Sequence, residues 1–352
     1  MKKLQRTVYL LLFIFLSAAG LYFARGFLIP LALAAVLALL LTGESNYLER
    51  RGMNRGISSL LSVLSLILII GIVIFVLSLQ VNNIMEDMSQ MKERLSSMAN
   101  NVMQWINEKL GITYSEQKKM IEEKGKDSAI PGALLSGLVN MVIIVVYMYL
   151  LLYTRTHIKK FILKLVPEDE RENALTIIHQ SVQVIQKYLG GLGAMIVMLW
   201  VLYSIGFSIV GVENAIFFAI LCGSLEIIPF IGNLIGTSVT LLAVLVQGGD
   251  SSVIIGVLIT YGIIQFVQSY ILEPLIVGKQ VSINPLFTII ALVLGETIWG
   301  AAGMFLALPL LGIVKIVCDH VPDLQPYGFL IGTEKGDGQS MLDKFKNVLG
   351  KK

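Results

Sequence analysis

Residues 214–249 read NAIFFAILCGSLEIIPFIGNLIGTSVTLLAVLVQGG and contain a single formal charge, Glu226. A straight helix of this length would extend about 54 Å, whereas the hydrocarbon core of a bilayer is about 30 Å thick. The run Pro229-Phe230-Ile231-Gly232-Asn233 interrupts the stretch near its middle. A helix that breaks inside a bilayer frees backbone polar groups, so such breaks occur within protein or against a water-filled cavity. The stretch therefore predicts a broken helical hairpin in a membrane protein.

The composition of the whole chain supports this interpretation. Of its 352 residues, 55% are hydrophobic and only 14% are charged, and the mean hydropathy is +0.78. Soluble globular chains carry about 25% charged residues, and disordered chains are poor in apolar residues. Both classes are excluded, and we expect an all-α polytopic membrane protein in contact with the lipid bilayer. The net charge of +3 is too small to indicate a nucleic-acid partner.

Further apolar runs without a formal charge have roughly the 17–25 residues that cross the hydrocarbon as a helix. They predict about six full transmembrane helices, at residues 7–24, 26–42, 57–80, 131–153, 189–212 and 251–272. Arg25 alone separates the first two, which predicts a tight helical hairpin. A second over-long stretch, residues 280–314, has Gly295, Gly300 and Gly303 near its middle. It predicts another long broken or re-entrant hairpin.

The placement of basic residues orients these spans. Lys and Arg gather before the first span, between the second and third, and after the fourth, so we expect both termini in the cytoplasm. The predicted organisation is transmembrane helices at 1–80, an external helical segment at 81–130, a fourth span at 131–153, cytoplasmic interfacial helices at 154–188, a core region at 189–318 containing the hairpins 214–249 and 280–314, and a cytoplasmic tail at 319–352.

The external segment carries a heptad pattern that continues the third span as one long helix. Its apolar positions recur at spacings of three and four from Val81 to Trp105. Two interpretations remain open: contact between subunits, or packing against the later part of the same segment around residues 112–121.

Acidic residues at membrane depth are the strongest functional candidates. Glu226 and Glu296 lie inside the two broken stretches, and Glu273 ends the span 251–272. An ionisable residue in a bilayer is costly and indicates a functional site by default, and broken helices supply free backbone groups for a solute or ion. The alternative is a structural carboxylate that accepts backbone N–H bonds at a helix break.

A polar stripe lies between the two breaks. Tyr261, Gln265, Ser269 and Glu273 recur every four residues, and Gln268 widens the stripe. Such a stripe indicates either a lining for a polar path or interhelical hydrogen bonds that hold the bundle together.

Enzyme chemistry finds no support in the sequence. The chain has no phosphate-binding loop, no metalloprotease H-E-x-x-H and no G-x-S-x-G elbow, so we expect no catalytic residues and no ATPase activity or subunit. Cys222 and Cys318 fall in apolar runs and are expected to be packed rather than paired. We expect no metal and no cofactor.

These motifs resemble the AI-2E family, the autoinducer-2 exporter-like, permease-like membrane proteins. The resemblance lies in the run that begins at Glu226 and contains Pro229 and Gly232, in Glu273-Pro-Leu-Ile-Val-Gly-Lys, in Asn284-Pro-Leu and in residues 295–309. It covers about residues 7–322. Asn233 stands where the family often has Pro, and Asn284 where it often has His. The second difference removes a titratable group from any proton route through that position.

The resemblance implies a secondary-type transporter in the bacterial cytoplasmic (inner) membrane that exports a small polar, autoinducer-2-like solute. It also implies a homo-oligomer, for which a pentamer is one candidate. The two broken hairpins themselves suggest the hypothesis of an elevator-like movement relative to an oligomeric scaffold. A Na⁺(Li⁺)/H⁺ antiporter that exchanges through Glu226 and Glu296 is the first alternative, and a non-transport membrane scaffold is the second. The candidate solute- or ion-binding residues are Glu226, Pro229, Gly232, Asn233, Gln265, Ser269, Glu273, Asn284, Pro285 and Glu296.

Overall fold

A computed structural model describes residues 2–86, 130–229, 231–277 and 283–333. Within these ranges every regular element is a helix, and the single β-bridge, between Ile283 and Gly332, is isolated. Six described helices are long and apolar enough to cross a membrane. They are α2 (Arg25–Arg50), α3 (Arg55–Glu86), α6 (Ile130–Leu165), α7 (Arg171–Val210), α10 (Ser251–Val267) with its continuation, and α11 (Pro285–His320). The predicted class of all-α polytopic membrane protein is confirmed.

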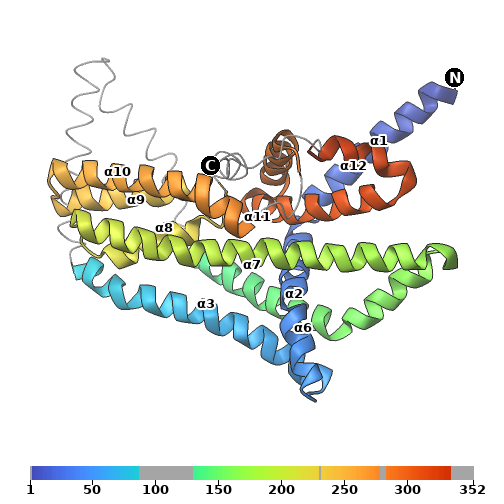
Figure 1. The fold of residues 1–352 in the computed structure, drawn as a ribbon, viewed down its shortest axis with the longest axis horizontal. Coiled ribbons are helices and arrows are strands. Elements are labelled where there is room, and N and C mark those ends of the chain that lie inside the picture. Colours follow the sequence, from blue (N-terminus) through green and yellow to red (C-terminus); the bar gives the residue numbers. More distant parts are fainter. Residues whose placement is uncertain (1, 87–129, 230, 278–282, 334–352) are drawn as a thin grey trace, which may run out of the picture. The chain divides into compact units, whose positions relative to one another are not determined.

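The first predicted span, residues 7–24, lies almost entirely in the helix α1 (Lys2–Phe23), and α11, which the sequence predicted as a broken hairpin, is among the six long apolar helices. The predicted hairpin between the first two spans is wrong. The Leu28 N–H donates to the Ala24 carbonyl with helical spacing, and in Figure 1 α1 extends away from α2 rather than back along it. A single linking residue leaves no room for a reversal.

The third span is described as far as Glu86, beyond its predicted end at residue 80. The heptad pattern and nearly all of the segment 81–130 lie outside the described residues, as does most of the polar tail.

The chain divides into two compact units. Unit 1 contains Met1–Gly43, Leu150–Gly191 and Val277–Lys352, and unit 2 contains Glu44–Tyr149 and Leu192–Ile276. Each unit is assembled from segments that are distant in the sequence, because the long helices α2, α6 and α7 contribute to both. The units are described separately below.

Unit 1 has an apolar centre made by the buried side chains of Val36, Ile185, Leu189 and Leu306. Gln186 Nε2 donates to the Leu39 carbonyl at 3.1 Å and joins α7 to α2. After α11 come a 3-10 turn (Pro322–Leu324) and the short helix α12 (Gln325–Ile331), which packs on α11.

The helix α11 is interrupted at Gly300, which has φ 61° and ψ −143°. The chain reverses there, because a Cβ placed on Gly303 would lie 1.9 Å from the Gly295 carbonyl oxygen. Two residues eight positions apart meet only if the arms fold against each other. The tip is held by Trp299, whose Nε1 donates to the Leu21 carbonyl at 3.0 Å.

Unit 2 contains α3, the first part of α6, the second part of α7, and the helices α8 (Ala215–Leu225), α9 (Ile231–Gln247) and α10. Figure 1 shows α8, α9 and α10, coloured yellow to orange, alongside one another. The helices α7 and α10 approach closely at glycines, since a Cβ on Gly206 would lie 2.3 Å from Thr260 Cγ2 and one on Gly256 would lie 2.1 Å from Val210 Cγ1. Small residues at helix contacts are typical of membrane bundles.

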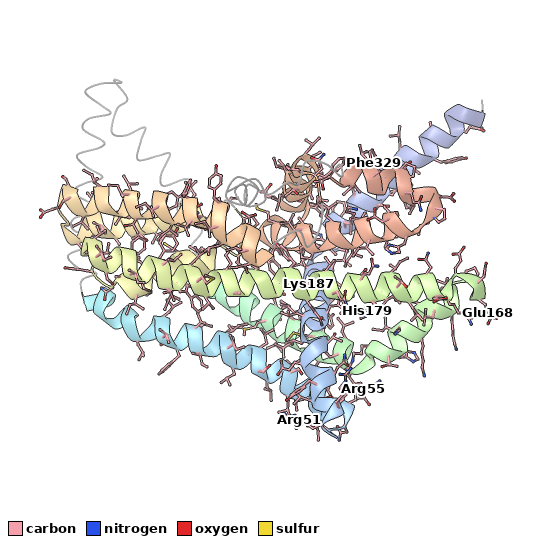
Figure 2. The ribbon with its side chains drawn as sticks, in the orientation of Figure 1. Arg51, Arg55, Glu168, His179, Lys187 and Phe329 are labelled. Carbon is pink, nitrogen blue, oxygen red and sulfur yellow. The ribbon has the colours of Figure 1, made fainter. Side chains whose placement is uncertain are left out.

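The start of unit 2 is a polar turn between α2 and α3, where Arg51 and Arg55 lie in Figure 2. Asn54 caps α3 through its side chain, which accepts from the Ile57 N–H at 2.9 Å. Arg55 pairs with Glu49 at 3.6 Å, and the Arg51 guanidinium lies over the Tyr47 ring. The turn therefore satisfies its own basic groups.

Candidate functional site

The break between α8 and α9 is built from residues that cannot continue a helix. Pro229 has no N–H, and the chain turns through short-range bonds, from Ile228 N–H to the Leu225 carbonyl at 3.0 Å and from Gly232 N–H to the Ile228 carbonyl at 3.0 Å. A Cβ on Gly232 would lie 1.6 Å from the Leu225 carbonyl oxygen. Only glycine lets the two arms approach this closely. Pro229 and Gly232 thus shape the hairpin.

Glu226 lies at the C-terminal end of α8, on this break, and its carboxylate is held by a neighbouring helix. Gln268 Nε2 donates to Glu226 Oε1 at 2.6 Å. Gln265 Nε2 donates in turn to Gln268 Oε1 at 3.1 Å. The two amides form a chain that ends on the carboxylate, and a hydrogen bond to a charged acceptor is stronger than one between neutral groups.

The helix type changes at Gln268. The α-helix of α10 gives way to a π-helix, η2, over Gln268–Val277. Gln268 is 6% exposed, whereas the side chains of Ser269 and Glu273 are exposed. Of the predicted stripe and its neighbour, Gln265 and Gln268 therefore take part in the contacts with Glu226, and Ser269 and Glu273 do not.

A second buried group of polar side chains lies on α9 and α7. The Tyr203 hydroxyl donates to Asn233 Oδ1 at 3.4 Å, and both residues are buried. Tyr203 also lies close to the Gln265 side chain, which connects this pair to the amide chain. One turn along α9, the Thr237 hydroxyl is buried and has no hydrogen-bond partner among the described residues. An unpaired buried hydroxyl calls for a ligand or an ordered water.

The structure thus brings together three predicted residues of unit 2, Glu226, Asn233 and Gln265. Tyr203, Thr237 and Gln268 join them without having been among the candidates. Gln268 was visible as a polar residue beside the predicted stripe. Tyr203 and Thr237 had no sequence signal, because single hydroxyl-bearing residues are common in transmembrane helices.

The remaining candidates, Asn284, Pro285 and Glu296, belong to unit 1. Asn284 is the N-cap of α11: its Oδ1 accepts from the Leu286 N–H at 3.0 Å, and Pro285 occupies the first helical turn. The Asn284 N–H donates to the Ile331 carbonyl at 2.8 Å. In the structure these bonds give Asn284 a structural role. Glu296 is exposed, on the first arm of α11.

The cluster in unit 2 contains one carboxylate among neutral amides and hydroxyls. Among the described residues no group of three His, Cys, Asp or Glu side chains is placed to hold a metal ion. The hydrogen bonds that link Glu226 to Gln268, Gln268 to Gln265 and Tyr203 to Asn233 involve amides and a hydroxyl rather than Lys or Arg. The chemistry suits a cation or a neutral solute with hydroxyl groups, and it disfavours an anion.

A polytopic helical bundle with polar side chains gathered at a break in an apolar helical stretch is typical of membrane transport proteins. The family model of AI-2E family transporters matches residues 11–323, and the chain belongs to this family.

Its relatives carry transport names. The Bacillus subtilis protein named "Putative transport protein YrrI" is 25% identical over 83% of this chain and 86% of its own length. Two Escherichia coli proteins are similar over most of both chains. "Putative transport protein YhhT" is 21% identical over 89% of this chain and 90% of its own length, and "Putative permease PerM" is 25% identical over 90% and 93%. The prediction of the family is confirmed, and the chain is a multi-pass membrane protein of a transporter family.

Proposed function

We propose that the chain exports a small polar solute across the bacterial cytoplasmic (inner) membrane, driven by an ion gradient, with the solute or the coupling ion bound at Glu226. The observation that carries this proposal is the partly buried bond between Gln268 and Glu226 at the break between α8 and α9. A carboxylate at membrane depth is costly, and here the Gln268 amide donates to it while the Gln265 amide donates in turn to Gln268. A purely structural carboxylate at a helix break would accept backbone N–H bonds, whereas Glu226 accepts from a side-chain amide of another helix.

The chain has no nucleotide-binding loop, so its energy source is an ion gradient or a partner. The two hairpins of the transport core are the moving parts of an elevator-like mechanism, carried within a homo-oligomer with cytoplasmic termini. Crosslinks that lock the hairpin region to the first four spans should stop transport. Normal flux in the crosslinked protein would contradict this movement.

The test is a flux assay in proteoliposomes with a panel of small polar solutes, including autoinducer-2, under an imposed Na⁺ or pH gradient. We expect Glu226→Gln to abolish flux. The matched control is Glu172→Gln, which removes the same charge from an exposed position at the start of α7. Equal flux in wild type and Glu226→Gln would show that the site is misassigned.

Cation/proton antiport is the second candidate, favoured by the single carboxylate in an otherwise neutral cluster. If this candidate is correct, adding Na⁺ or Li⁺ should change the internal pH of vesicles that contain the protein and no organic solute. In this mechanism Glu226 and Glu296 exchange the cation for a proton. If neither a solute nor a cation moves, the third class of function, a membrane scaffold, is favoured.

A further inference from the structure

The end of α6, in unit 1, carries basic and apolar side chains that the proposed function does not use. We call residues 155–165 the basic elbow. The helix α6 has 36 residues and would extend about 54 Å, which exceeds the roughly 30 Å of the hydrocarbon core. Part of α6 must therefore lie outside the core. The basic side chains of α6 all occur in the elbow: Arg155, His157, Lys159, Lys160 and Lys164.

The basic elbow has a narrow apolar face. At about 100° per residue, Ile158, Phe161, Ile162 and Leu165 fall on one side of the helix. All four side chains are exposed, Phe161 at 58% and Leu165 at 69%. Within the part of the chain that the structure describes, this face is left open.

Lysines line both edges of this apolar face. Lys159 follows Ile162 around the helix on one side, and Lys164 follows Phe161 on the other, with Lys160 beyond it. This is the geometry in which lysine stems lie along an apolar surface and the ammonium groups extend to the headgroup level.

The three lysines of the elbow differ from other basic residues near it. Arg171 pairs with Glu168 at 2.7 Å and closes the turn after α6 by donating from Nε to the Leu163 carbonyl at 3.2 Å. Glu168 lies at this turn in Figure 2. In contrast, Lys159, Lys160 and Lys164 are exposed and have no acidic partner among the described residues.

We propose that the basic elbow lies in the membrane interface and binds anionic phospholipids, with its lysines on the headgroup phosphates and its apolar face among the acyl chains. Charge complementarity favours this occupant, because three lysines without an acidic partner in the described ranges border one apolar strip. A zwitterionic lipid covers the same apolar face but does not compensate the three positive charges. A protein partner for such a strip would need acidic residues on both sides of a narrow apolar ridge.

The experiment uses the full chain with Cys222 and Cys318 replaced by Ser, so that a bimane fluorophore can be attached at Ile162→Cys. The protein is reconstituted into vesicles of equal parts phosphatidylcholine and phosphatidylglycerol, with the bromine quencher on the acyl chains of one lipid or of the other. We expect stronger quenching by brominated phosphatidylglycerol. Each lysine near an anionic surface is worth about 1 kcal/mol, so a single Lys159→Gln should lower the preference by up to about fivefold.

The triple variant Lys159→Gln, Lys160→Gln, Lys164→Gln should be quenched equally by the two lipids. The matched control removes three charges at the α2–α3 turn, Arg50→Gln, Arg51→Gln and Arg55→Gln, and should retain the wild-type ratio. High salt should reduce the preference in wild type, because it screens exposed charges. Equal quenching by both lipids in wild type, an unchanged ratio in the lysine triple variant, or no quenching at all would overturn the proposal.

Discussion

The tight contact at Gly232 makes the hairpin geometry directly testable through Gly232→Ala. The added methyl group would lie 1.6 Å from the Leu225 carbonyl oxygen, whereas Cβ atoms in proteins keep at least 3.0 Å from such neighbours. The obstacle is backbone, which cannot rotate away as a side chain would. The arms of the hairpin must therefore move apart by more than 1 Å at this level.

Two consequences follow from such a displacement. Overpacking of this kind costs about 1–3 kcal/mol, or on the order of 2–4 °C in melting temperature per kcal/mol. The same displacement moves Glu226 relative to Gln268. The hydrogen bond from Gln268 Nε2 to Glu226 Oε1, which is 2.6 Å long, would then be stretched or broken. We expect solute flux to fall together with stability.

The assay is a thermal melt of the purified protein followed by size-exclusion chromatography, with flux measured in proteoliposomes. The control is Gly190→Ala on α7, where an added Cβ has no neighbour within 4 Å. It should leave flux unchanged and stabilise the helix by up to about 1 kcal/mol. A Gly232→Ala protein with wild-type melting temperature and flux would refute the close approach of α8 and α9.

Four further expectations follow from single contacts. Gln268→Leu removes the donor to Glu226. A hydrogen bond to a charged acceptor is worth about 1.5–3 kcal/mol, so the KM for the solute should rise about 10- to 150-fold. An unchanged KM would contradict a role for this amide. Tyr203→Phe removes only a hydroxyl and should reduce flux by less than Gln268→Leu; a larger loss would assign the tyrosine a direct role. Asn284→Ala removes the side-chain cap of α11 and should lower the free energy of unfolding by about 1 kcal/mol. Asn284→Ser keeps a capping oxygen and should retain the wild-type stability. Loss of flux in a fully stable Asn284→Ser protein would indicate that Asn284 binds the solute or ion. If both hairpins re-enter the membrane, a cysteine at Lys279, which lies outside the described residues, should be labelled from the cytoplasmic side only, and labelling from outside would indicate full crossing.

Much of the architecture follows from local properties of the chain. Apolar runs longer than a bilayer is thick predict membrane helices, and Pro229 and Gly300 mark real interruptions because neither a missing N–H nor a positive φ is compatible with a regular helix. The importance of Glu226 was also predictable, since an isolated charge in an apolar run is costly wherever the chain folds. The failure at the α1–α2 junction has a local cause too: Arg25 can simply continue a helix.

The partners around that charge depended on tertiary structure. A straight α-helix would place Gln265, Ser269 and Glu273 on one face, but the helix becomes a π-helix at Gln268, and it is Gln268 that donates to Glu226. The pairing of Tyr203 with Asn233 joins residues thirty positions apart, and no periodicity links them. Hydropathy determined that this chain spans a membrane and where its helices break, because burial in lipid acts on each segment separately. Which polar groups meet at the break was decided only by the packing of α7, α9 and α10, because hydrogen bonds require atoms from different helices at specific distances.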